Sequence, residues 1–102
     1  MAAVIQAGTE LGSVSTVKTS SAQSIARNNA RRSITIQNRS TSTLYVKLTA
    51  PASGAPTAAD SHFAISAGGS TDDGTASMIS LDNYIGAIYT NAVAQTVVEF
   101  IY

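Results

Sequence analysis

Apolar and polar residues alternate along much of this chain, at the period of two that is typical of β-strands. The clearest run is 32–38, in which two isoleucines share one face. A second run, 43–49, carries three aliphatic residues at every other position. Because only a few polar residues separate the two runs, the pattern predicts that they form a β-hairpin.

Six more segments favour strands: 13–18, 22–25, 61–66, 77–81, 84–89 and 96–102. The stretch 24–30 is also compatible with a helical turn. Two prolines and a glycine predict a loop over 50–59. In the last strand Glu99 shares a face with Val97, and a charge usually indicates solvent, so Val98 and Phe100 are expected to face the core.

Short strands at this spacing, with turn residues between them, predict an all-β fold: a single antiparallel β-sandwich or jelly-roll-like barrel. Residues 1–12 contain little to bury and are expected to form an N-terminal arm, which leaves 13–102 as the sandwich domain. The expected core consists of Ile34, Ile36, Leu44, Val46, Leu48, Phe63, Ile65, Ile88, Val98 and Phe100.

Charge is scarce and unevenly placed. The 102 residues include six basic and six acidic side chains, so 12% of residues are charged and the formal net charge is zero. Soluble domains usually have about 25% charged residues, so this surface is suited to protein contact. Every basic residue lies before position 48, and five of the six acidic residues lie after position 59. This asymmetry fits either attraction between two sheets or a head-to-tail contact between copies.

The residue types exclude several kinds of chemistry. No cysteine is present, and His62 is the single histidine, so disulfides, thiolate sites and multi-histidine metal cages within one chain are excluded. We therefore expect neither an enzyme nor a bound cofactor or metal. The sequence shows no basic, apolar leader and no run of about 20 apolar residues, so no membrane contact is expected.

Two short motifs have the residue types of a site but the wrong arrangement. Asp60, Ser61 and His62 are those of a hydrolytic triad, but neighbours on an extended segment point to alternate sides and cannot converge. The run 72–74, Asp-Asp-Gly, lacks the spacing of a calcium loop and is read as a solvated turn.

The interaction candidates are a basic cluster and the apolar residues of the predicted arm. Arg27, Arg31 and Arg32 form the cluster. Nucleic-acid binding would call for net positive charge and nearby aromatic residues, so the cluster is expected either to contact another protein or simply to be solvated. The arm contributes Val4, Ile5 and Leu11, and 12 extended residues span at most about 40 Å, enough to reach a neighbouring subunit.

The order of several short motifs resembles that of the small β-sandwich virion proteins of tailed bacteriophages. The motifs are Asn28-Asn29, Arg31-Arg32, Ser33–Asn38, Leu44–Lys47, Ser66–Gly69, Ile85–Tyr89 and Val97–Glu99. They lie within residues 14–102. The chain departs from the usual pattern at Ala67, where a proline ordinarily precedes the glycine.

This resemblance implies a structural role and no catalytic residues. Proteins of this kind are often capsid decoration (cement) proteins, commonly homotrimeric, that bind the major capsid protein on the virion surface after synthesis in the bacterial cytoplasm. The alternative is a head–tail or tail-fibre module that binds a receptor or glycan, for which Tyr45, Tyr84 and Tyr89 are the candidate residues.

Overall fold

A computed structural model describes residues 12–67 and 77–101. The strands are β1 (Ser13–Thr19), β2 (Gln23–Ile25), β3 (Arg31–Asn38), β4 (Leu44–Lys47), β5 (Phe63–Ile65), β6 (Met78–Asp82), β7 (Ile88–Thr90) and β8 (Gln95–Ile101). The described residues contain no helix, so the all-β prediction is confirmed.

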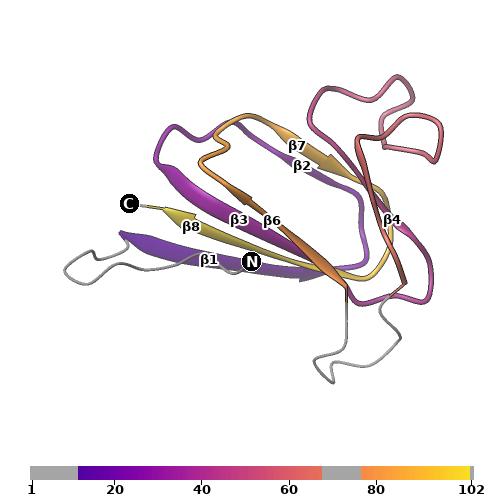
Figure 1. Cartoon of the computed structure of the whole chain (residues 1–102), viewed down its shortest axis with the longest axis horizontal. Coiled ribbons are helices and arrows are strands. Elements are labelled where there is room, and N and C mark those ends of the chain that lie inside the picture. The colour runs from indigo at the N-terminus through magenta and orange to yellow at the C-terminus, as the bar shows by residue number, and fades with distance from the viewer. Residues whose placement is uncertain (1–11, 68–76, 102) are drawn as a thin grey trace.

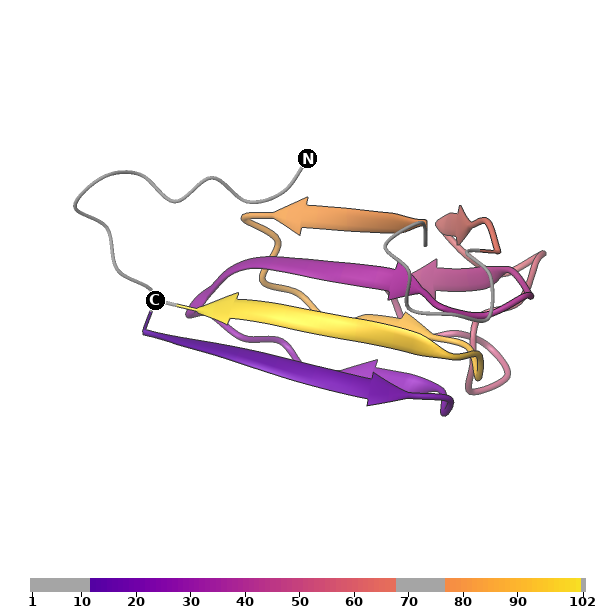
Figure 2. The ribbon, with the colours of Figure 1, turned by 90° about the horizontal axis from the view of Figure 1, so that it is seen from below.

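The strands form two antiparallel sheets of four. The β3 sheet has the order β1-β8-β3-β6, and the β4 sheet has the order β2-β7-β4-β5. In Figure 2 the β3 sheet lies toward the viewer, with β6, β3, β8 and β1 stacked from top to bottom and the β4 sheet behind (Figures 1 and 2). Consecutive strands change sheet at almost every connection, and β4 to β5 is the exception.

The hydrophobic core lies between the two sheets. Its buried apolar residues are Ile34, Ile36 and Val97 from the β3 sheet and Leu44, Val46, Ile65 and Ile88 from the β4 sheet. Ile25, Leu48, Ile79, Leu81, Tyr84 and Val93 pack around them, partly buried. Two antiparallel sheets that share one core make this architecture consistent with a β-sandwich.

The predicted hairpin between 32–38 and 43–49 is wrong. β3 pairs with β6 and β8, whereas β4 pairs with β5 and β7, so the two strands lie in different sheets. Alternation shows which side of a strand is apolar and does not identify its hydrogen-bonded neighbour. Here the two apolar faces meet across the core, which buries both sets of side chains.

The face assigned to the last strand is also wrong. Residues directly opposite on neighbouring strands share a face. Val97 pairs with Ile36 and Glu99 pairs with Ile34, so these two residues of β8 face inward, while Val98 and Phe100 are half-buried on the outer face. The error has a physical cause, because Glu99 is neutralised inside the protein by Arg31.

One further core prediction, that for Phe63, differs from the structure. Leu48 is partly buried and packs against the core, as expected. Phe63 is 39% exposed, because β5 is the edge strand of the β4 sheet and its first residue has strand neighbours on one side only among the described residues. The remaining six members of the expected core are buried.

The inward assignment of β8 can be tested with two adjacent valines. Val97→Ala should lower the free energy of unfolding by about 2 kcal/mol, since it removes two buried methyl groups and leaves a cavity. Val98→Ala, the matched control on the half-buried outer face, should cost less than about 1 kcal/mol. Urea unfolding measures both, and equal or reversed effects would contradict the register.

Candidate functional site

The three arginines of the basic cluster have different environments. Arg27 is exposed, and its Nε donates to Asn29 Oδ1 at 3.1 Å. Arg32 is half-buried. Arg31 is 2% exposed and points into the protein. The cluster is therefore not one continuous surface, and Arg31 has a structural role in the folded chain.

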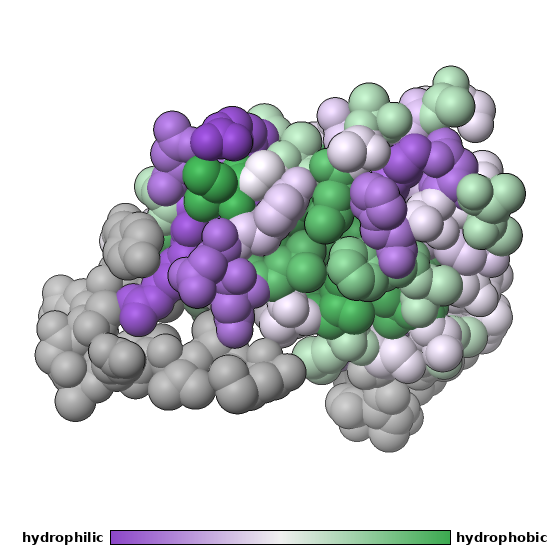
Figure 3. All heavy atoms as spheres, turned by 45° about the horizontal axis from the view of Figure 1, so that its top comes forward, coloured by the Kyte–Doolittle hydropathy of each residue, from purple (hydrophilic) through white to green (hydrophobic). Residues whose placement is uncertain are grey.

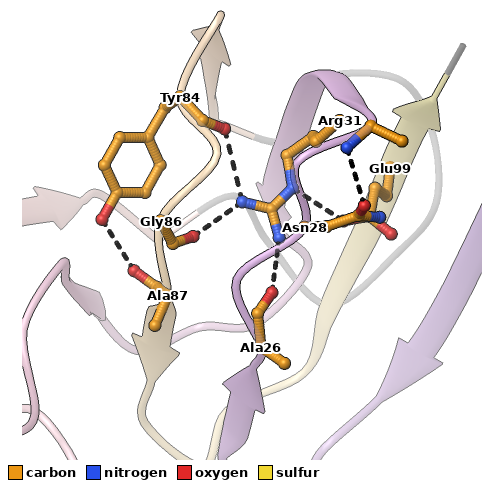
Figure 4. A network of polar contacts seen from close by, with 8 residues as sticks. Ala26, Asn28, Arg31, Tyr84, Gly86, Ala87 and Glu99 are labelled. Carbon is orange, nitrogen blue, oxygen red and sulfur yellow. Dashed lines mark hydrogen bonds and ion pairs between the residues drawn. The ribbon is translucent and has the colours of Figure 1, made fainter.

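Arg31 binds groups from three separate parts of the chain (Figure 4). Its Nε donates to Glu99 Oε2 on β8 at 2.7 Å. Its terminal nitrogens donate to the carbonyl oxygens of Ala26 at 2.9 Å, Tyr84 at 3.3 Å and Gly86 at 2.7 Å. A charge-assisted network of this kind fixes the relative positions of the 26–30 connection, the 84–87 segment and the end of β8.

The same network explains why the predicted strand 84–89 begins late. Carbonyl groups of Tyr84 and Gly86 accept from Arg31, and β7 starts at Ile88. The Tyr84 hydroxyl donates toward the carbonyl oxygens of Ala87 at 2.9 Å and Leu48 at 3.2 Å. A Cβ at Gly86 would lie 2.7 Å from Tyr84 Cζ, so any other residue there would have to displace the Tyr84 ring.

Buried amides occupy the other end of the core. Asn38 and Gln95 are directly opposite in the β3–β8 pair, and both are 0% exposed. Asn38 Nδ2 lies 2.8 Å from the Ser42 carbonyl oxygen and 3.0 Å from that of Ile65. This links the end of β3 to the β4 sheet. Gln95 Nε2 donates to the Asn91 carbonyl oxygen at 2.9 Å, which fixes the turn before β8.

The segment 60–62 is held by bonds that leave no triad. The Asp60 carboxylate pairs with Lys47 Nζ and accepts from the Ala52 amide at 2.9 Å. His62 Nδ1 accepts from the Leu48 amide at 3.0 Å. The Asp60 and His62 side chains therefore bond to different parts of the chain, and the arrangement anchors the loop that precedes β5.

The described residues contain no group of three or more histidine, cysteine, aspartate or glutamate side chains placed to hold a metal ion. The acidic turn at 72–74 lies outside them. Among the same residues no helix has the length and hydropathy to cross a bilayer.

The broadest candidate surface is the outer face of the β3 sheet, which we call the docking face. By strand register its exposed and half-buried residues are Val14, Thr16 and Lys18 on β1, Val98 and Phe100 on β8, Thr35 and Gln37 on β3, and Met78, Ser80 and Asp82 on β6; Ser33 and Thr96 lie on the same side but are buried. Of the residues that the register places on this face, the two charged ones lie on the edge strands, and the others are apolar, hydroxyl and amide side chains. Arg32 lies at the β-bulge between Arg31 and Ser33, outside this register. Such a surface costs little to desolvate and suits contact with another protein.

The outer face of the β4 sheet differs in character. Tyr45 and Tyr89 are half-buried on adjacent strands and are diagonal neighbours, because Lys47 lies directly opposite Tyr89. Tyr45 faces Ala64 on the other side, and Tyr89 faces Ser24. We call Tyr45, Lys47 and Tyr89 the tyrosine face. Tyr84, the third tyrosine of the sequence prediction, has its hydroxyl bonded internally.

Figure 3 shows the molecule from the side turned away from the docking face. In the view of Figure 3, hydrophobic residues form a band across the middle of the molecule, and hydrophilic residues lie in separate groups on either side.

The sequence pattern did not identify the docking face as one surface. The available signal was the mixture of Val, Thr and Ser in 13–19, which is strand-forming with a single charge. The arm candidates Val4, Ile5 and Leu11 lie outside the described residues.

The buried ion pair can be tested by a matched pair of substitutions. Arg31→Met should destabilise the fold by about 3–5 kcal/mol, because it leaves Glu99 and three carbonyl groups without their donor. Arg27→Met, on the exposed arginine, should change stability by less than about 0.5 kcal/mol. Thermal and urea unfolding decide the matter, and similar effects of the two substitutions would disprove the role assigned to Arg31.

The loop anchor predicts a pH dependence. The hydrogen bond from Lys47, followed by that from the Ala52 amide, lowers the pKa of Asp60 below its ordinary 3.8. Because the folded pKa is depressed, this contribution to stability is fully present above pH 3.8 and is lost as the pH falls through the folded pKa. Lys47→Met should move the Asp60 pKa back upward, and Lys18→Met should not. Carboxyl NMR titration measures this, and an unmoved Asp60 pKa in Lys47→Met would contradict the assignment.

Comparison of the chain with protein-family models, with curated proteins and with solved structures finds no match.

Proposed function

We propose that this chain is a bacteriophage virion structural protein, a capsid decoration (cement) protein that binds the major capsid protein on the outside of the shell. The observation that carries the proposal is the docking face, a four-stranded surface whose two charges lie at its edges. The order of sequence motifs, which resembles that of small β-sandwich virion proteins, supports the same role. The proposed location is the virion surface, after synthesis in the host cytoplasm.

The composition of the docking face suits binding to another protein. Val98 and Thr35 occupy its middle strands and are directly paired in the register. Protein interfaces place uncharged residues at the centre and polar residues at the rim, where water remains. Lys18 and Asp82 lie on the outermost strands, where they would form such a rim.

The mechanism needs no chemistry beyond binding. A protein that binds the assembled shell and not its dissociated subunits stabilises the shell by mass action, in proportion to the logarithm of its free concentration over its dissociation constant. Many copies, each bound weakly, would together hold adjacent capsid subunits in place. Neither nucleic acid nor a membrane takes part in this proposal, and no catalytic group is needed.

The proposal also includes a jelly-roll-like arrangement of the strands, an N-terminal arm and self-association. Chain crossings between sheets at almost every connection favour a jelly-roll-like arrangement. We propose that residues 1–12 act as an arm whose Val4, Ile5 and Leu11 contact a neighbouring subunit. Arg27, which is exposed, and Arg32, which is half-buried, would contribute at the periphery. Self-association, most simply a homotrimer, would multiply the number of docking faces in each particle.

The tyrosine face favours a second function, that of a head–tail or tail-fibre module that binds a receptor or glycan. Two tyrosine rings on adjacent strands offer apolar ring surfaces, and Lys47 and Asp60 lie beside them as hydrogen-bonding groups. Sugar rings stack on aromatic faces because both surfaces are weakly hydrated. This function would use the opposite side of the sandwich from the docking face.

A pair of surface variants separates the two functions. Val98→Glu places a charge in the middle of the docking face, and Ala64→Glu is the control on the outer side of the β4 sheet. Co-sedimentation with shells of the major capsid protein from the phage that encodes this chain should show at least a tenfold weaker affinity for Val98→Glu and an unchanged affinity for Ala64→Glu.

Other outcomes of this binding assay would count against the docking face. Wild-type binding by Val98→Glu would contradict it, provided that circular dichroism shows both variants to be folded. Wild-type chain that fails to bind shells but binds a glycan, with loss of binding in Tyr45→Ala or Tyr89→Ala, would favour the tail module instead.

A further inference from the structure

The two edges of the β3 sheet form a complementary pair. β1 is seven residues long, and every residue but Thr19 is exposed. Within the described residues it pairs with β8 on one side only, and β6 has the same position at the opposite edge, beside β3. An edge strand presents unpaired backbone N–H and C=O groups, which another strand can bind.

The charges on the two edges have opposite signs. Lys18 is the one charged residue of β1, and Asp82 is the one charged residue of β6. Both residues are exposed and lie on the docking face. Pairing of β1 with the β1 of another copy, or of β6 with β6, would offer the single charge of either strand no charge of opposite sign. Pairing of β1 with β6 instead brings opposite charges together, which discriminates among the possible contacts.

Strand direction allows this contact. All neighbours in the β3 sheet are antiparallel, so β1 and β6 run in opposite directions. A second copy placed with its β1 beside β6 of the first therefore continues the antiparallel sheet, and the docking faces of both copies stay on the same side. The backbone groups of both edges then gain the hydrogen bonds of a regular antiparallel ladder.

One register satisfies both the apolar and the charged residues. Val17 faces the inner side of β1 but is 45% exposed, although its neighbour Val97 is buried. Leu81 lies on the inner side of β6 and packs against the core. If Val17 lies opposite Leu81 of the other copy, Thr16 lies opposite Asp82, and Lys18 becomes the diagonal neighbour of Asp82, about 7–8 Å away between Cα atoms and within reach of a lysine side chain.

We propose that a second copy of this chain binds through antiparallel pairing of β1 with β6, head to tail, with Val17 opposite Leu81. A head-to-tail contact of this kind generates a closed ring when its rotation allows closure. The proposal identifies the surface used in the self-association proposed above and rests on that part of the proposed function. Its test takes place in solution and does not depend on binding to a capsid.

Cysteine pairs test the contact cleanly, because the chain has no cysteine of its own. Within one molecule β1 and β6 are separated by β8 and β3, three strand spacings or about 14 Å, which is far beyond the Cα separation that a disulfide allows. Any disulfide in the double variant Val17→Cys/Leu81→Cys must therefore join two copies. Mild oxidation should produce covalent multimers on a non-reducing gel that reduction removes.

The single variants supply the controls. Val17→Cys and Leu81→Cys should each remain monomeric on the same gel. A covalent dimer of Val17→Cys would show β1–β1 pairing and overturn the proposal. A double variant that gives no multimers while its circular dichroism shows a folded chain would also overturn it.

Charge exchange provides an independent measurement on the exposed residues. By analytical ultracentrifugation, Lys18→Glu should weaken self-association about five- to tenfold, since it replaces an attraction by a repulsion. Adding Asp82→Lys should restore the association to near the wild-type value. A wild-type chain that sediments as a monomer at high concentration, or a double charge variant no better than Lys18→Glu, would contradict the contact. Neither result would alter the prediction for shell binding.

Discussion

The guanidinium of Arg31 is the group on which the arrangement of this sandwich most depends. It lies between the sheets, and its four donated hydrogen bonds connect the start of β3 to the 26–30 connection, the segment before β7 and the end of β8. A buried arginine costs free energy to remove from water, and the cost is offset only where a carboxylate and several acceptors surround it. Glu99 and three carbonyl groups meet that requirement here, so the same network that tolerates the charge also fixes three chain segments.

The opposite end of the core is closed by neutral groups. Asn38 and Gln95 occupy the positions that would extend the apolar rows of β3 and β8. The Asn38 amide bonds to the carbonyl oxygen of Ile65 in the β4 sheet, and the Gln95 amide bonds to those of Ser21 and Asn91 in the connections between strands. The apolar core is thus confined to the middle of the sandwich. The charges of Arg31 and Glu99 are likewise turned inward, so neither contributes to the outer face of the β3 sheet.

Sequence pattern predicted the strands well because strand formation is local. The inward positions of Ile34, Ile36, Leu44 and Val46 follow directly from alternation. Pairing is not local, and the hairpin prediction failed because two apolar strand faces are equally satisfied by lying side by side or by packing across a core. The Asn38 amide, which bonds to the chain near Ser42 and Ile65, holds the crossing between sheets.

The functional surfaces were harder to predict for a related reason. Arg31 was grouped with Arg27 and Arg32 because sequence proximity does not show which of three arginines turns inward. Reading the charge of Glu99 as a sign of solvent reverses the two faces of β8 and leaves Val98 and Phe100 out of the candidate interaction residues. Each error came from treating a charge as exposed. The partner that makes a buried charge tolerable is 68 residues away in the sequence.

We propose that this chain covers a capsid through its docking face. Electron microscopy of purified phage whose genome carries this sequence tests the proposal most directly. The account predicts a regular lattice of two-layered β density over the outside of the shell, with the sheet containing β1, β8, β3 and β6 turned toward the major capsid protein. Density for this chain confined to the tail, or its absence from purified particles, would contradict the account.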